Sequence, residues 1–113
     1  MPALFDLEIV SSTAEEVRAR VPVTDACKQP LGLVHGGLYA LIADTLTAGE
    51  GRAITNQTSF LRPVMGGTIH AAAHRRHQGR TTAVWETYLT DDADRLCALV
   101  RTTIQVPGPD TRR

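Results

Sequence analysis

The sequence has 113 residues, with 12 Lys+Arg balanced by 12 Asp+Glu, and 42% of its residues are hydrophobic. This length predicts one domain over residues 1–106, with residues 107–113 as a polar C-terminal tail. Because so small a domain buries only about 65% of its unfolded surface, we expect self-association as a homodimer or tetramer. The zero net charge argues against nucleic acid or a membrane surface as partner.

Apolar runs and cysteines indicate the compartment. No stretch approaches the roughly 18 uninterrupted apolar residues of a membrane span, and the first residues lack the pattern of a signal peptide. The sequence therefore predicts a cytoplasmic protein. Reducing conditions there favour free thiols at Cys27 and Cys97 over a disulfide.

The first part of the chain alternates between apolar and polar residues over 5–9 and 17–23. This period of two predicts two strands, joined by a turn at Ser11-Ser12-Thr13. From Thr24 to Leu33 the alternation stops, which indicates a loop. A helix is predicted next, over about residues 34–47, because apolar residues recur there at helical spacing.

Four more strands are predicted, over residues 54–61, 68–77, 81–90 and 96–106, with turn residues between them. The order of elements predicts an α+β fold, in which one long helix covers a mostly antiparallel sheet of about six strands. The edge strand of such a sheet needs a partner, and joining two sheets edge to edge would supply it.

The segment Gly32-Leu33-Val34-His35-Gly36-Gly37 lies where the loop becomes the helix. Glycines at a helix N-terminus leave backbone N–H groups bare at the positive end of the helix dipole. Such groups favour an anion, or a carbonyl oxygen that becomes one. The alternative is that Gly36 and Gly37 only let the helix pack closely against a strand.

Asp44 is the only charged residue between positions 36 and 47. Helical spacing places it beside Gly37, Ala40 and Ala48, which leave room for a ligand, although it could also be an ordinary solvated aspartate. His35 lies nine residues earlier, about 13.5 Å away along the axis and on the opposite side of the helix. If both act on one substrate, a second chain must supply one of them, so the active site would be shared across a dimer interface.

The motif GLVHGGLYALIADT at 32–45 resembles the helix motif of hotdog-fold thioesterases, in which an acidic residue follows the histidine of HGG by nine positions. FLRPV at 60–64 is similar to the next strand of that family, and RHQGRTTAVWETYLTDDADRLCALVRTTIQV at 76–106 to its closing meander. The resemblance covers residues 21–106. It is greatest to bacterial hydrolases of aromatic acyl-CoA thioesters, of the PaaI, 4-hydroxybenzoyl-CoA and 1,4-dihydroxy-2-naphthoyl-CoA types, and it implies the hotdog fold.

The resemblance also implies an activity: hydrolysis of an acyl-CoA thioester, with an aromatic acyl group, to the free acid and CoA. Asp44 would be the nucleophile or general base, and the Gly36 N–H would polarise the thioester carbonyl. His35 would hold the turn in shape, and Gln29 would orient the thioester or the water. A reactive carboxylate and an N–H at the developing oxyanion are the two parts that this hydrolysis needs.

CoA would bind as part of the substrate, and neither another cofactor nor a metal ion is implied. The turn at Gln78-Gly79 is surrounded by arginines, which bind phosphate bidentately, so it is expected to hold the CoA phosphates; the alternative is a solvated hairpin tip. The residues expected to contact substrate or CoA are Gly37, Arg62, Gly79, Arg80, Thr81 and Thr82.

Two features depart from the family pattern. The segment between Asp44 and Phe60 is shorter than usual, and the family's supporting Ser or Thr would fall on Ala53, with Thr55 and Thr58 as nearby candidates. Position 48, which is threonine in some relatives, is alanine.

Other chemical features are weaker. His70, His74 and His77 lie in a predicted strand, where His77 would face away from the other two, so a metal site is not expected. Trp85 is expected in the core. The alternative function is a non-catalytic acyl-CoA-binding hotdog module; a dehydratase of the same fold is less favoured, because its histidine and acid lie in a motif absent here.

Overall fold

The computed structural model describes residues 5–49 and 51–107, and most of the predicted tail, residues 108–113, lies outside them. Its elements are β1 (Glu8–Ser12), β2 (Glu16–Pro22), the short 3-10 helix η1 (Asp25–Cys27), α1 (Gly36–Thr47), β3 (Arg52–Phe60), β4 (Thr68–Gln78), β5 (Thr82–Thr90) and β6 (Leu96–Gln105). One long helix and six strands confirm the predicted α+β architecture.

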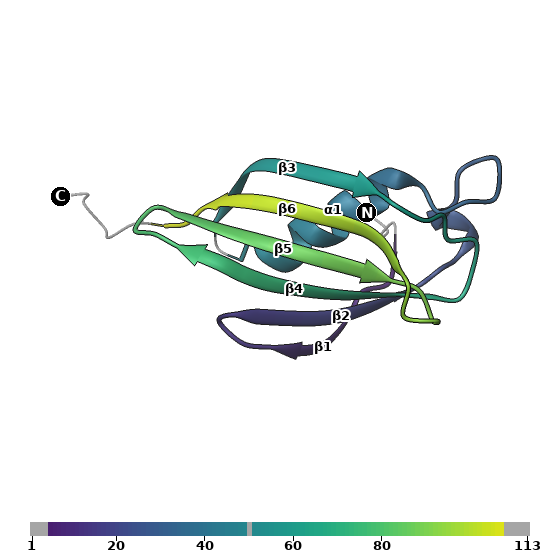
Figure 1. The fold of residues 1–113 in the computed structure, drawn as a ribbon, viewed down its shortest axis with the longest axis horizontal. Helices are drawn as coiled ribbons and strands as arrows, with labels where there is room; N and C mark the ends of the chain where they lie inside the picture. Colours follow the sequence, from purple (N-terminus) through teal and green to yellow (C-terminus); the bar gives the residue numbers. More distant parts are fainter. Residues whose placement is uncertain (1–4, 50, 108–113) are drawn as a thin grey trace.

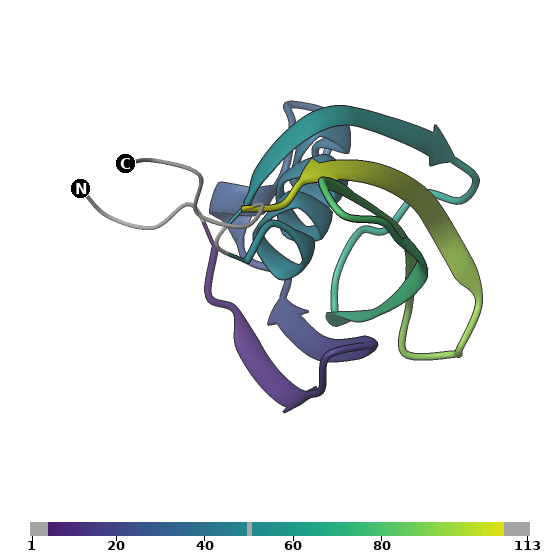
Figure 2. The same cartoon turned by 90° about the vertical axis from the view of Figure 1, so that its left-hand side faces the viewer.

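The strands form one antiparallel sheet in the order β1-β2-β4-β5-β6-β3. Helix α1 lies against one face of this sheet (Figure 1). Viewed from the end, the sheet curls around the helix (Figure 2). β3 follows α1 directly in the chain but pairs with β6, so it forms the edge of the sheet opposite to β1.

The core lies between α1 and the concave face of the sheet. Residues of β2 and β5 alternate regularly between buried and more exposed, as the period of two predicts. Trp85 is buried on β5, as predicted. Thr102 interrupts the apolar face of β6, and its hydroxyl pairs with that of Thr47 on α1 at 2.9 Å. A buried hydroxyl needs such a partner, so this pair lets a polar residue occupy the core.

Two predicted boundaries are wrong. The first strand begins at Glu8 and continues through Ser12, and the turn comes later, where the Thr13 hydroxyl accepts hydrogen bonds from the N–H groups of Glu15 and Glu16. The helix begins at Gly36 rather than near Val34. Val34 is instead extended, because its N–H donates to the Val64 carbonyl at 2.7 Å and it bridges to Lys28.

The predicted orientation of His77 is also wrong. A bulge between Arg75 and His77 shifts the register of β4, so that His77 lies opposite Val84 of β5, and His74 lies opposite Glu86. Residues that oppose each other across an antiparallel pair share a face. His77 therefore shares the outer face with His74, because the additional residue of the bulge reverses the alternation.

The edge strand β3 is exposed along most of its length. Seven of its nine residues are exposed, including Ile54 at 54% and Phe60 at 64%. Its outward backbone groups have no neighbouring strand within the described residues. An edge with apolar side chains and unpaired backbone groups is suited to pairing with another chain.

Candidate active site

A cavity of about 600 Å³ lies at the N-terminal end of α1. One wall is the loop that precedes the helix together with the first helical turn, and the other is the segment that follows β3. The lining residues are Gln29, Leu33, Val34, His35, Gly36, Tyr39, Phe60, Leu61, Arg62 and Pro63. The structure thus brings together four residues that the sequence singled out: Gln29, His35, Gly36 and Arg62.

His35 caps the helix and fixes the shape of the loop. Its N–H donates to the Cys27 carbonyl at 2.8 Å, and its own carbonyl accepts from the Leu38 N–H at 2.9 Å. Its side chain Nδ1 accepts from the Gly37 N–H at 3.4 Å. The imidazole therefore accepts the Gly37 N–H and leaves the Gly36 N–H without an acceptor from this side chain.

The Gly36 N–H is a free donor at the cavity. It is at the first helical position, so it has no acceptor within the helix, and no acceptor from the described residues meets it elsewhere. The Phe60 ring packs directly over this glycine, because a Cβ built on Gly36 would lie 2.8 Å from a ring carbon. Close packing against Phe60 therefore favours glycine here, as one of the two interpretations of the sequence predicts, and the chemical role of Gly36 stays a prediction.

Gln29 lines the same cavity as Gly36. Its backbone N–H donates to the Leu33 carbonyl at 2.8 Å, and its carbonyl accepts from the Gly32 N–H at 2.9 Å. The side-chain Oε1 accepts from the Leu31 N–H. The amide NH₂ is thus the end of the side chain that remains available to a ligand.

Asp44 does not line this cavity. It is half-buried on α1, and one carboxylate oxygen, Oδ1, is buried without a hydrogen-bond partner in the described structure. Eight residues of helix separate it from Gly36, which corresponds to about 12 Å. A single chain therefore does not bring Asp44 and Gly36 together.

The predicted CoA-binding turn, residues 79–82, joins β4 to β5 at the end of the sheet opposite to the end of β3 (Figure 1). The last residue of β3, Phe60, lines the cavity, so the turn and the cavity lie at opposite ends. The Thr81 carbonyl accepts from the Val106 N–H at 2.9 Å, and Thr82 pairs with Gln105, which also pairs with Arg52 just after the helix. The turn is therefore on the side of the molecule where α1 ends. Asp44 and the turn lie toward one end, and the cavity lies at the other.

The three arginines near this turn differ in their surroundings. Arg76 donates to Glu86 at 2.9 Å and to the Tyr88 hydroxyl at 2.9 Å, and Arg75 lies 3.8 Å from Glu15. The two hydrogen bonds of Arg76 occupy its guanidinium group, whereas Arg75 forms only a long ion pair with Glu15. Arg80 is exposed and forms no ion pair with a carboxylate of the described residues. Arg80 is therefore the arginine most available to an anion.

Asn56 is a residue that the sequence did not single out. From β3, its amide donates to the Ala40 carbonyl at 3.0 Å, and its oxygen accepts from the Thr58 hydroxyl at 2.9 Å. Ala40 lies one turn before Asp44 on the same side of α1. Asn56 thus fixes the edge strand to the part of the helix that carries Asp44. No motif pointed to it, because its contact depends on where β3 lies beside the helix.

The positions proposed for a supporting hydroxyl have different environments. Ala53 is half-buried against the core and lacks a hydroxyl. Thr55 is exposed and pairs with Thr103, whereas Thr58 is half-buried and opposes the buried Val100, which places it on the helix side of β3. Of these, only Thr58 faces the helix with a hydroxyl.

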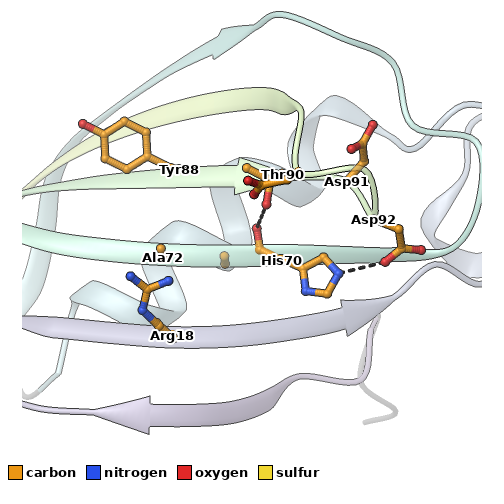
Figure 3. Close-up of a pocket in the computed structure, with 9 residues that line it drawn as sticks. Arg18, His70, Ala72, Tyr88, Thr90, Asp91 and Asp92 are labelled. Atoms are coloured by element: carbon orange, nitrogen blue, oxygen red, sulfur yellow. Dashed lines mark hydrogen bonds and ion pairs between the residues drawn. The ribbon is translucent and has the colours of Figure 1, made fainter.

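The outer face of the sheet holds a second cavity, of about 390 Å³, which contains none of the predicted site residues (Figure 3). His70 lies 2.8 Å from Asp92 there, and Asp92 also accepts from the Thr68 N–H at 3.2 Å. These contacts, the His70 hydrogen bond first, lower the pKa of Asp92. They fasten the turn after β5 to the start of β4, which is a structural role.

Three further observations concern the cysteines, metal-binding groups and membrane-spanning helices. Cys27 and Cys97 are both free and buried. Among residues 5–49 and 51–107, no group of His, Cys, Asp and Glu side chains is arranged to hold a metal ion. No helix of the described residues has both the length and the apolar character needed to cross a membrane.

Comparison with known proteins identifies the family. A family model described as the acyl-CoA thioesterase N-terminal domain matches residues 24–105. The proofreading thioesterase EntH of Klebsiella pneumoniae is 30% identical over 102 residues, which cover 81% of this chain and 74% of EntH. The 1,4-dihydroxy-2-naphthoyl-CoA hydrolase of Listeria monocytogenes is 29% identical over 110 residues, which cover 88% and 89% of the two chains.

A solved structure agrees with this result. The crystal structure of thioesterase HI1161 from Haemophilus influenzae superposes with a TM-score of 0.84 at 26% identity, covering 90% of this chain and 78% of that chain. One helix against a six-stranded antiparallel sheet is thus the shared architecture. The chain belongs to the hotdog-fold acyl-CoA thioesterase family and is an acyl-CoA thioester hydrolase.

Proposed function

We propose that this enzyme hydrolyses an aromatic acyl-CoA at a site formed by Gly36 of one chain and Asp44 of another. The observation that carries the proposal is a pair of groups without partners among the described residues: the Gly36 N–H meets no acceptor there, and Asp44 Oδ1 is buried without a donor. A buried carboxylate oxygen without a donor is rare in folded proteins, because it costs about 1–3 kcal/mol, whereas the first N–H of a helix ordinarily lacks a partner within the helix. A thioester carbonyl would satisfy the Gly36 N–H, and a water molecule the Asp44 oxygen.

The two groups have complementary roles in hydrolysis. As negative charge develops on the thioester oxygen, the Gly36 N–H stabilises it, supported by the positive end of the α1 dipole. Asp44 either attacks the carbonyl carbon itself or takes a proton from the attacking water. In both routes the C–S bond breaks, water supplies the new acid oxygen, and CoA leaves as the thiol.

A dimer would bring Gly36 of one chain close to Asp44 of the other. Gly36 and Asp44 lie about 12 Å apart on one helix, whereas the exposed edge strand β3 offers a surface on which a second chain can pair. Two chains paired antiparallel along this edge run their helices in opposite directions, which sets the N-terminal end of one helix toward the later turns of the other. Homodimer or tetramer formation is therefore part of the proposal.

The lining of the cavity supports an aromatic acyl group. Tyr39 and Phe60 both line it, with ring centroids 6.5 Å apart and planes inclined by 51°. Aromatic rings favour tilted and edge-to-face neighbours, so this pair can accept a third ring at low cost. The naphthoyl-CoA hydrolase named above, which acts on an aromatic acyl-CoA, provides a second line of support.

A panel of acyl-CoA thioesters tests the substrate class, with release of the CoA thiol as the readout. We expect kcat/KM for benzoyl-CoA to exceed that for hexanoyl-CoA by about tenfold or more, as the difference of one favourable aromatic contact predicts. The two acyl groups are similar in size, so the comparison isolates the ring. Equal or faster hydrolysis of hexanoyl-CoA would contradict the aromatic preference.

The turn at residues 79–82 is proposed to bind the CoA phosphates. Arg80 is exposed and unpaired with any described carboxylate, and the hydroxyls of Thr81 and Thr82 add donors beside it. Because this turn and Asp44 lie toward the same end of a chain, one protomer would supply both the carboxylate and the nucleotide site. Its partner would supply the cavity, with Arg62 also contacting substrate. Gly37, which the sequence also predicted to contact substrate, does not line that cavity, and its N–H donates to His35. The cytoplasmic location stays a prediction.

Replacing Arg80 by alanine tests this binding site. We expect Arg80→Ala to raise KM for acyl-CoA by about tenfold, because a charge-assisted phosphate contact is lost, and to leave kcat nearly unchanged. A truncated pantetheine thioester of the same acyl group, which lacks the phosphates at issue, should be affected little. Arg95→Ala, at the opposite end of the sheet, is the control. If Arg80→Ala impairs both substrates equally, the arginine acts on structure and the phosphate site is wrong.

A further inference from the structure

Two side-chain hydrogen bonds tie α1 to the sheet, one on either side of Asp44. One turn before Asp44, the Ala40 carbonyl accepts from the Asn56 amide at 3.0 Å. About one turn after it, the Thr47 and Thr102 hydroxyls lie 2.9 Å apart. Asn56 and Thr102 oppose each other on β3 and β6, so a single cross-strand pair makes both contacts.

The directions of these hydrogen bonds follow from the other partners of the same groups. The Thr47 hydroxyl donates to the Ala43 carbonyl at 2.8 Å, so the proton between the two threonines comes from Thr102. The Asn56 oxygen accepts from the Thr58 hydroxyl at 2.9 Å, while the amide NH₂ bonds the helix. Both residues of the cross-strand pair therefore donate to α1.

The position of the Asp44 carboxylate depends on where this part of α1 lies. Its Oδ1 has no hydrogen-bond partner among the described residues, so no side-chain contact holds that oxygen. Within the helix, the Asp44 N–H donates to the same Ala40 carbonyl that Asn56 bonds, which places the two donor nitrogens within about 6 Å of each other. A displacement of about 1 Å at a reacting group lowers a rate by up to about 10²-fold.

The pair is polar at positions where packing alone asks for apolar residues. Thr102 is fully buried and faces the helix, and Thr47 is 5% exposed. Buried polar groups that are fully hydrogen-bonded fix one arrangement of the elements they join. The contacts of this pair therefore fix the register of α1 on the sheet at the two turns that flank Asp44.

We propose that Asn56 and Thr102 are positioning residues, which hold α1 where the Asp44 carboxylate can reach the thioester. This inference rests on the proposed function, because it takes Asp44 as the reacting group. It adds that two residues of the sheet control turnover through the helix. Neither of them lines the cavity at Gly36, so their loss should alter kcat rather than KM.

Thr102→Val tests the contact after Asp44, since it removes the hydroxyl and keeps the shape of the side chain. Thr47 retains the Ala43 carbonyl as its acceptor, so no donor is left unpaired and Tm should not fall. On the faster of benzoyl-CoA and hexanoyl-CoA, we expect kcat to fall by about tenfold with KM nearly unchanged. Thr102→Ser keeps the hydroxyl and should retain the wild-type kcat.

Asn56→Ala tests the contact before Asp44 and should lower kcat by a similar factor. Thr87→Val is the matched control for both. Thr87 is a fully buried threonine of β5 whose hydroxyl has no partner in the described structure, so its loss removes no contact with α1. Its replacement should leave kcat and KM as they are in wild type.

Three results would overturn the inference. If Asp44→Asn is inactive but Thr102→Val or Asn56→Ala keeps the wild-type kcat, the pair does not position Asp44, and the proposed function stands without it. If Thr87→Val or Thr102→Ser lowers kcat as much as Thr102→Val does, the effect is one of core packing. If Asp44→Asn retains turnover, the proposed function fails and the inference fails with it.

Discussion

Asp44→Asn is expected to lower turnover by about 10² to 10⁴-fold, as the loss of a positioned base or nucleophile predicts. The substitution keeps the shape of the side chain and removes its charge. Because Oδ1 forms no hydrogen bond in the described structure, no structural contact of that oxygen is lost. The free energy of unfolding should therefore change by less than about 1 kcal/mol. Steady-state hydrolysis of benzoyl-CoA and a denaturant titration measure the two quantities.

Asp6→Asn is the control for the change of charge. Asp6 is exposed, precedes β1 and does not line the cavity. Its replacement should leave turnover as it is in wild type. Retention of more than about a tenth of wild-type turnover by Asp44→Asn would remove Asp44 from the reaction.

The sequence predicted most of the fold because its periodicities are strong. Each strand of the meander alternates between residues that pack under α1 and residues that face outward, so this period of two locates the strands to within a few residues. The errors lie where a particular backbone hydrogen bond or bulge, rather than the apolar pattern, determines the conformation. Val34 precedes the helix and is extended, because its N–H donates to the Val64 carbonyl, and the bulge after Arg75 reverses the face of His77. Neither interaction leaves a signal in the local sequence.

The sequence could predict those site residues whose positions follow from the geometry of the helix backbone. The HGG segment marks the start of the helix to within two residues, and the helical repeat then fixes the separation of His35 and Gly36 from Asp44. Tyr39, Phe60 and Asn56 were not found, because they join the site through the packing of β3 beside α1. That packing depends on residues about 20 positions apart in the chain, so it needs the three-dimensional structure.

Mixing two inactive variants tests whether the active site is shared. In Gly36→Val the branched side chain meets the Phe60 ring, since even a Cβ would lie 2.8 Å from it, so the N–H donor is displaced. Phe60 is 64% exposed, and its ring can turn toward solvent, which allows the chain to fold. Gly36→Val and Asp44→Asn homodimers should each be nearly inactive, because every site contains one lesion.

Subunit exchange between these two variants should restore activity. A mixed dimer holds one site with both lesions and one site with neither, if Gly36 of one chain works with Asp44 of the other. At equal mixing half of the dimers are mixed, so about a quarter of the wild-type rate is expected. Asp44→Asn mixed with Asp44→Ala is the control, and no site free of lesions can form in it. If mass spectrometry shows mixed dimers and the rate stays at background, Gly36 and Asp44 act within one chain. The separation of about 12 Å along α1 would then have to be bridged by the substrate itself.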